Sequence, residues 1–139
     1  MAEKMEKQYS QTVTSTGAGR DGHVKGEGGI DFAVTAPGGD GVNPESLLAA
    51  AWSACFNGAL QKTMKEAGVD VSKHAPQVDA EVTLNTVESG FRLSGTITAR
   101  FAHAEELDNA QELVDKADAF CPFSKALRGD IDTKAVAAS

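Results

Sequence analysis

At 139 residues, the chain has the length of one domain that can bury a sizeable core. Its net charge of −7 and isoelectric point near 4.9 argue against a nucleic-acid or anionic-membrane partner, since such partners are held by Lys and Arg contacts. No apolar run has the length of a membrane span, and the charged start MAEKMEKQYS lacks the apolar segment of a signal peptide. The expected compartment is therefore cytoplasmic, where two cysteines are more often free, catalytic or redox-active than a structural disulfide.

The first part of the chain predicts short strands joined by turns. YSQTVTST (9–16) is rich in β-branched residues and predicts a strand, and the Gly-rich GAGRDG (17–22) predicts a turn. A short strand is expected in HVKGEG (23–28). IDFAVT (30–35) alternates apolar and polar residues as a half-buried strand does, and APGGDGVN (36–43) predicts a flexible loop.

A long helix is expected over residues 43–68. Asn43 is a good N-cap, Pro44 suits the first helical position, and Gly68 is a reasonable stop. Apolar residues recur at spacings of three and four and form a wide stripe, which we expect to be buried: Leu47, Leu48, Ala51, Trp52, Cys55, Phe56, Ala59, Leu60 and Met64. Several alanines keep the helix slim, so another backbone can pack close to it.

The second half predicts a β-hairpin followed by helices. Alternating apolar residues in 77–86 and 91–101, with a turn between them, indicate antiparallel strands. An acidic amphipathic helix is expected over 104–120, a short helix from Pro122 to near Gly129, and a last strand in DIDTKAV (130–136). This order does not alternate as βαβ units do, so the predicted class is α+β, in a single domain over 1–139. A hairpin on one long helix leaves an open face, which hints at a dimer.

The two cysteines lie in different settings. Pro122 at the first position of a helix puts Cys121 at the N-cap, where the helix dipole favours a thiolate, although a small hydrophobic residue before a helix is an equally good reading. Cys55, on an apolar helix face, is most simply a packing residue. Burial alone raises a thiol pKa, so a reactive Cys55 needs a cation nearby.

Two cations are candidates for that role. Lys62 lies about two turns along the same helix, and Arg20 lies in the Gly-rich turn, whose backbone can approach the helix closely. A solvated turn arginine is the plainer reading of Arg20. Glu45, in the first helical turn, complements the helix dipole or orients Arg20 through a bidentate pair.

Other chemistries find little support in the sequence. His23, His74 and His103 are scattered, with no His or Cys pair at zinc-ligand spacing, so no metal and no cofactor are expected. GEGG and GGDG lack the lysine of a phosphate loop. Ser53 and Ser124 lack the G-x-S-x-G setting of a serine hydrolase.

Four separated motifs together resemble one family. They are GRDG (19–22), NPESLLAAAWSACFNGAL (43–60), VDAEVTL (78–84) and CPFSKALRGDID (121–132). They look like the organic hydroperoxide resistance proteins, the peroxidase branch of the Ohr/OsmC superfamily. The resemblance implies an Ohr/OsmC-like fold, with antiparallel sheets packed around a central helix, in an intertwined homodimer with two active sites at its interface. Phe123 departs from the pattern, where tyrosine is expected.

The resemblance implies a role for each site residue. Cys55 matches the peroxidatic cysteine, Cys121 the resolving cysteine, Arg20 the arginine that stabilises the thiolate and Glu45 the carboxylate that holds it. The implied activity is reduction of organic (alkyl or lipid) hydroperoxides to alcohols, through a Cys55 sulfenic acid and an intramolecular disulfide. The implied reductant is a dithiol, especially a lipoyl group on a protein.

Two questions stay open at the level of sequence. Glu45 and Cys55 are ten residues apart, or about 15 Å along a helix, so one arginine does not easily reach both. We therefore hypothesise that Glu45 comes from the partner subunit. The alternatives to an organic hydroperoxide peroxidase are the osmotically inducible (OsmC) branch and a non-catalytic redox-sensing or ligand-binding dimer.

Overall fold

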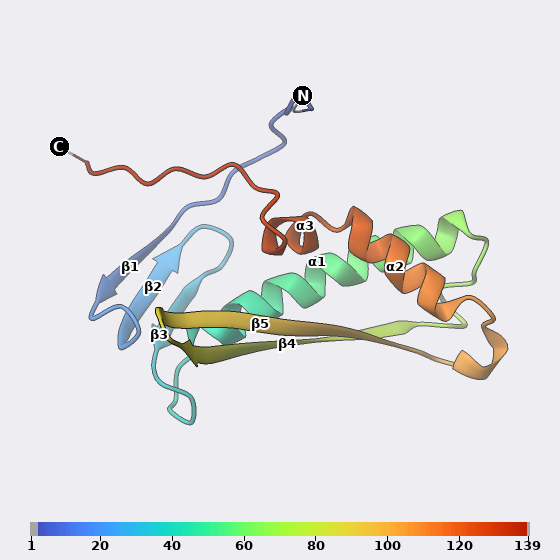
Figure 1. Ribbon diagram of the computed structural model, residues 1–139, viewed down its shortest axis with the longest axis horizontal. Helices are drawn as coiled ribbons and strands as arrows, with labels where there is room; N and C mark the ends of the chain where they lie inside the picture. Colours follow the sequence, from blue (N-terminus) through green and yellow to red (C-terminus); the bar gives the residue numbers. More distant parts are fainter. Residues whose placement is uncertain (1–2, 139) are drawn as a thin grey trace. The chain divides into compact units, whose positions relative to one another are not determined.

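The computed structural model describes residues 3–138, which form two compact units (Figure 1). One unit ends at Leu47 and the other begins at Leu48, so the first turn of the long helix belongs to one unit and the rest of it to the other. The division leaves the single domain over 1–139 as a prediction. Within residues 3–138, no helix is long and apolar enough to cross a membrane.

The first unit contains a three-stranded antiparallel sheet. Its strands β1 (Val13–Gly17), β2 (Gly22–Gly26) and β3 (Asp31–Val34) pair in chain order. Strand β1 begins later than the predicted 9–16, because its first paired residue, Val13, already lies opposite Gly26 at the end of β2. The turn between β1 and β2 contains Gly19 at φ +77°, a left-handed conformation that favours glycine.

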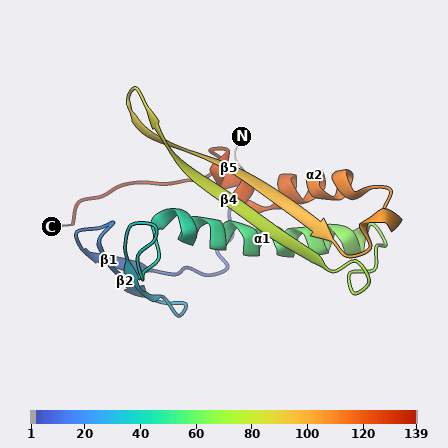
Figure 2. The same ribbon diagram turned by 90° about the horizontal axis from the view of Figure 1, so that it is seen from below.

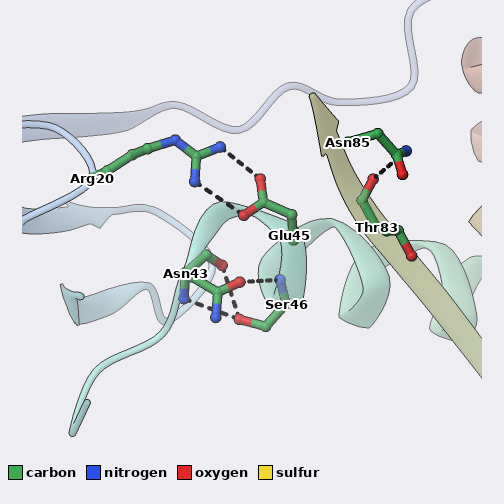
Figure 3. A network of polar contacts seen from close by, with 6 residues as sticks. All are labelled: Arg20, Asn43, Glu45, Ser46, Thr83 and Asn85. Atoms are coloured by element: carbon green, nitrogen blue, oxygen red, sulfur yellow. Dashed lines mark hydrogen bonds and ion pairs between the residues drawn. The ribbon is translucent and has the colours of Figure 1, made fainter. Parts of the chain in front are cut away.

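The long helix α1 spans Pro44–Glu66, close to the predicted 43–68. The side-chain oxygen of Asn43 accepts from the Ser46 backbone N–H at 2.8 Å, and the Ser46 hydroxyl accepts from the Asn43 N–H at 3.0 Å (Figure 3). This reciprocal pair satisfies two backbone donors at the helix start, as in a capping box. At the other end, Gly68 takes φ +75° and the helix stops.

In the second unit, strands β4 (Pro76–Val87) and β5 (Gly90–Phe101) form the predicted hairpin. Both views show the hairpin as one layer, with α1 and α2 side by side in the other (Figures 1 and 2). The inward residues near the open end of the hairpin pack on the core: Val78, Ala80, Val82, Ile97, Ala99 and Phe101. Towards the turn, Leu84, Leu93 and Phe91 are 43%, 45% and 72% exposed. That end of the hairpin therefore has an uncovered apolar face.

The C-terminal helices differ from prediction at two places. Instead of one helix over 104–120, a 3-10 turn η1 (Ala104–Glu106) precedes α2 (Ala110–Phe120). Residues 107–109 break the helix because Leu107 is extended and Asn109 takes the N-cap position. The short helix α3 (Pro122–Leu127) follows as predicted. The strand expected in 130–136 is wrong, since that segment is exposed and pairs with no described strand.

The core of the second unit joins α1 to α2 and α3. Phe56, Leu60 and Met64 of α1 are fully buried, together with Leu113 of α2 and Cys121. Apolar burial of this kind is the main stabilising contribution to such a unit. Antiparallel sheets combined with non-alternating helices confirm the α+β class.

Candidate active site

Arg20 and Glu45 form a bidentate ion pair within one chain. The Arg20 Nη1 and Nη2 atoms donate to the two carboxylate oxygens of Glu45 at 3.0 and 2.6 Å (Figure 3). This hydrogen bonding raises the pKa of Arg20 and lowers the pKa of Glu45. The turn after β1 and the first turn of α1 lie in the same unit, so the fold of one chain brings the two groups together. The hypothesis that Arg20 pairs with Glu45 of the partner subunit is therefore wrong.

Cys55 lies on α1, half-buried against the core of the second unit. Burial raises the pKa of its thiol because the thiolate loses hydration there. The backbone amide of Phe123 acts in the opposite direction and lowers that pKa, while the neighbouring Cys121 sulfur raises it. Within this unit, the balance favours the protonated thiol.

Cys121 takes the predicted N-cap position of α3. Pro122 follows it at the first helical position, and the Cys121 Sγ accepts from the Ser124 backbone N–H at 3.5 Å. The Cys121 side chain is completely buried. Its location between α2 and α3 therefore fixes the sulfur against the core, where the Cys121 side chain has no contact with solvent.

The two sulfurs lie next to each other. The Cys121 Sγ donates to the Cys55 Sγ at 3.5 Å, across 66 residues of sequence, and both cysteines are free thiols. A disulfide needs an S–S separation of about 2.05 Å, so a movement of about 1.5 Å closes the gap. The arrangement suits thiol–disulfide chemistry between α1 and α3.

Lys62, the other cation weighed for Cys55, is engaged elsewhere. Its Nζ pairs with Glu66 at 2.7 Å and lies 4.4 Å from the centre of the Phe120 ring. The Lys62 side chain thus contacts Glu66, one turn later on α1, and Phe120 of α2. Arg20 remains the candidate cation, and its role towards Cys55 stays a prediction.

One contact beside the cysteines has no counterpart in the sequence predictions. The Trp52 Nε1–H donates to the Ser124 Oγ at 2.9 Å, and both side chains are buried. A buried indole N–H generally needs an acceptor, which is the signal that sequence reasoning could have used. The acceptor itself lies 72 residues away and cannot be read from local pattern.

A cavity of about 280 Å³ adjoins Trp52 and Ser124 in the second unit. Its walls are mainly apolar, with Leu48, Val82 and Leu93 among them, and the Asp118 and Arg128 side chains also line it. A separate group of possible cation ligands, His103, Glu105 and Glu106, is exposed on and beside η1. Exposed acidic groups of this kind are common without a metal.

Comparisons with known proteins agree with this geometry. Residues 37–136 match the family described as OsmC-like protein. The organic hydroperoxide resistance protein OhrB of Bacillus subtilis is 38% identical over 91% of this chain and 95% of its own length. The chain therefore belongs to the OsmC-like family, in its organic hydroperoxide resistance branch.

Solved structures give the same placement. The crystal structure of Bacillus subtilis OhrB aligns with a TM-score of 0.76 over 89% of this chain and 94% of that chain. An organic hydroperoxide resistance protein from Elizabethkingia anophelis, with thiocyanate bound, is 38% identical and aligns with a TM-score of 0.75 over 92% of this chain and 94% of that chain. A Vibrio cholerae protein, named as a putative organic hydroperoxide resistance protein with captopril bound in one of its active sites, is 33% identical, with a TM-score of 0.77 over 94% and 92% of the two chains.

Proposed function

We propose that the protein is a thiol-dependent peroxidase that reduces organic hydroperoxides to alcohols. The observation that carries this proposal is the 3.5 Å contact between the Cys55 and Cys121 sulfurs. Membership of the organic hydroperoxide resistance branch supports the choice of substrate class. The apolar cavity beside Trp52 offers room for the hydrocarbon part of such a substrate.

The reaction proceeds in three balanced steps. The Cys55 thiolate attacks the outer peroxide oxygen, so an S–O bond forms, the O–O bond breaks and the alkoxide takes up a proton to become the alcohol. Cys121 then attacks the Cys55 sulfenic acid, forming the S–S bond and releasing hydroxide, which leaves as water with the thiol proton. A dithiol finally reduces the disulfide by exchange and is itself oxidised. We propose a protein-bound lipoyl group as that dithiol and the cytosol as the compartment.

The first step needs a positive charge near Cys55, because burial raises the pKa of that thiol. Arg20 is held by Glu45, whose position on α1 is ten residues, or about 15 Å of helix, before Cys55. We therefore propose that the partner subunit's Arg20, held by the partner's Glu45, approaches Cys55 in a homodimer. This keeps the ion pair within one chain and makes the active site a shared one.

Two uncovered surfaces support a homodimer. The apolar end of the hairpin is exposed, and so is a row of small residues on α1, formed by Ala50, Ala54 and Gly58. A second subunit that packs on these surfaces would remove apolar area from water. Gly58→Arg places a long charged side chain on that row and should convert a dimer to monomer in analytical ultracentrifugation, with loss of peroxidase activity. A monomeric wild-type protein that retains full activity would contradict the shared site.

The peroxidase itself is tested by single-cysteine variants. Cys55→Ser should abolish consumption of an alkyl hydroperoxide in the presence of a dithiol. Cys121→Ser should consume about one equivalent and stop as a sulfenic acid that dimedone labels, because no resolving thiol is left. The wild-type protein should lose two hydrogens, mapped by mass spectrometry to a bridge between the two cysteine peptides. Full turnover by Cys55→Ser would reverse the roles of the cysteines.

The choice among related functions uses the same assay. An organic hydroperoxide peroxidase should react much faster with an alkyl hydroperoxide than with hydrogen peroxide, because the apolar cavity contributes only to the organic substrate. Equal rates would favour the OsmC branch. Peroxide consumption below one equivalent with excess dithiol present would favour a non-catalytic redox sensor.

A further inference from the structure

The helix that carries Cys121 is short and has little apolar anchoring of its own. Helix α3 has six residues, and its larger apolar side chains, Phe123 and Leu127, are 41% and 46% exposed. The buried side chain of α3 is that of Ser124, a polar residue at 2% exposure. The Ser124 hydroxyl accepts from the Trp52 indole, so a hydrogen bond rather than apolar packing joins α3 to α1 at this point.

The Trp52 ring is itself fixed on its other side. A Cβ atom added at Gly95 of β5 would lie 2.9 Å from Cζ3 of the indole, so the ring sits directly against the bare backbone of the strand. The ring is 8% exposed and belongs to the core of the second unit. Helix α1 and strand β5 therefore hold the ring in place, with its indole N–H directed at Ser124 of α3.

The hydrogen bond and the sulfur contact have matching registers. Trp52 precedes Cys55 by three residues on α1, and Ser124 follows Cys121 by three residues at the start of α3. Residues three apart share a helix face. The two contacts, 2.9 Å between indole nitrogen and hydroxyl and 3.5 Å between sulfurs, thus run side by side between the same pair of helices. The Ser124 N–H completes the link by donating to the Cys121 Sγ.

We propose that Trp52 and Ser124 are positioning residues for Cys121, which hold its sulfur at Cys55 for the resolving step. In the terms of the proposed peroxidase, on which this inference rests, they shorten the lifetime of the Cys55 sulfenic acid. This positioning role concerns the resolving step and not the attack of Cys55 on the peroxide. Holding two reacting groups together raises their effective concentration, and loss of one fixing contact lowers it.

The test measures that effective concentration without any peroxide. Wild type, Trp52→Phe and Ser124→Ala are equilibrated with glutathione redox buffers, and the fraction with a 55–121 disulfide is determined by thiol labelling and mass spectrometry. Each variant should show an effective concentration about tenfold lower, which is a reduction potential about 30 mV less negative. Ser124→Thr keeps the hydroxyl and should retain most of the wild-type value. Ser53→Ala, whose hydroxyl bonds only to its own helix at the Ala50 carbonyl, is the matched control and should not change it.

A double variant separates positioning from loss of packing. Because both side chains act through one bond, Trp52→Phe with Ser124→Ala should lose no more than either change alone. Additive losses, or wild-type values in both single variants, would overturn the proposal. Single-turnover oxidation with tert-butyl hydroperoxide adds the kinetic readout. The second phase, in which the disulfide forms, should be about tenfold slower, and it is scored separately from the first phase because both side chains also line the cavity proposed for the substrate. If wild type fails to react with the peroxide, the proposed function is wrong, while the glutathione equilibrium still decides the positioning role.

Discussion

Gly95→Ala should destabilise the second unit by pressing on the Trp52 ring. The new methyl group would lie 2.9 Å from Cζ3 of Trp52 and 3.1 Å from the Glu81 carbonyl oxygen, both closer than ordinary contact. The ring cannot move freely, because its Nε1 is bonded to Ser124 and it is 8% exposed. Overpacking of this kind costs about 1–3 kcal/mol. Urea unfolding followed by far-UV circular dichroism, at fixed protein concentration, measures the loss.

A second background makes this prediction specific. In Trp52→Phe the smaller ring lacks the atom nearest to the methyl group, so Gly95→Ala should cost clearly less there than in the wild type. An equal cost of Gly95→Ala in both backgrounds would show that the strain lies in the strand and refute the reasoning. The chain has one tryptophan, so a shift in its emission reports directly on the displaced ring.

Three further predictions concern the core and the charged pair. Leu60→Ala should lower the free energy of unfolding by about 2–5 kcal/mol, because this fully buried side chain leaves a cavity, and urea unfolding checks it. Arg20→Ala should move the pH profile of Cys55 alkylation by iodoacetamide to higher pH, since burial raises the thiol pKa and the proposed Arg20 charge no longer counteracts it; an unchanged profile would exclude Arg20 as the stabilising cation. Glu45 has a lowered pKa, so its contribution to stability is present above its ordinary pKa near 4.5 and is lost as the pH falls through the folded value. Glu45→Gln should therefore flatten the acid side of the stability profile, measured by thermal unfolding between about pH 3 and pH 6, and an unaltered acid limb would contradict this.

Short stretches of sequence correctly predicted those helices and strands whose formation depends on neighbouring residues alone. The start of α1 follows from Asn43 and Pro44, because capping and a fixed φ act within one helical turn. The β4–β5 hairpin follows from period-two alternation on both sides of a turn. The prediction of one helix over 104–120 was wrong at its start. The charges and spacing of this segment suit a helix, but Asn109 takes the N-cap position, so α2 begins only after it. The strand expected in 130–136 had suitable residues, but the segment pairs with none of the described strands, and residue type alone does not specify a pairing partner.

The site depended on contacts that no local pattern encodes. Cys55 and Cys121 are 66 residues apart, and only the family resemblance placed them together before the structure did. The Arg20–Glu45 pair was expected, but in the wrong arrangement of subunits, because spacing along a helix says nothing about where a preceding turn folds. The Trp52–Ser124 hydrogen bond was not predicted. A buried indole N–H generally requires an acceptor, but the sequence does not show which residue supplies it.

The separation of the two sulfurs along the chain has a consequence for the oxidised molecule. A bond between Cys55 and Cys121 would close a covalent ring that contains both strands of the hairpin and all of α2. By the chain-entropy relation, a ring of that length stabilises the folded state by about 4 kcal/mol, because it lowers the conformational entropy of the denatured chain. Each round of peroxide reduction would then alternate between a thiol form and a cyclised disulfide form. The disulfide form would resist heat and proteases better, so the oxidant would temporarily stabilise the protein that consumes it.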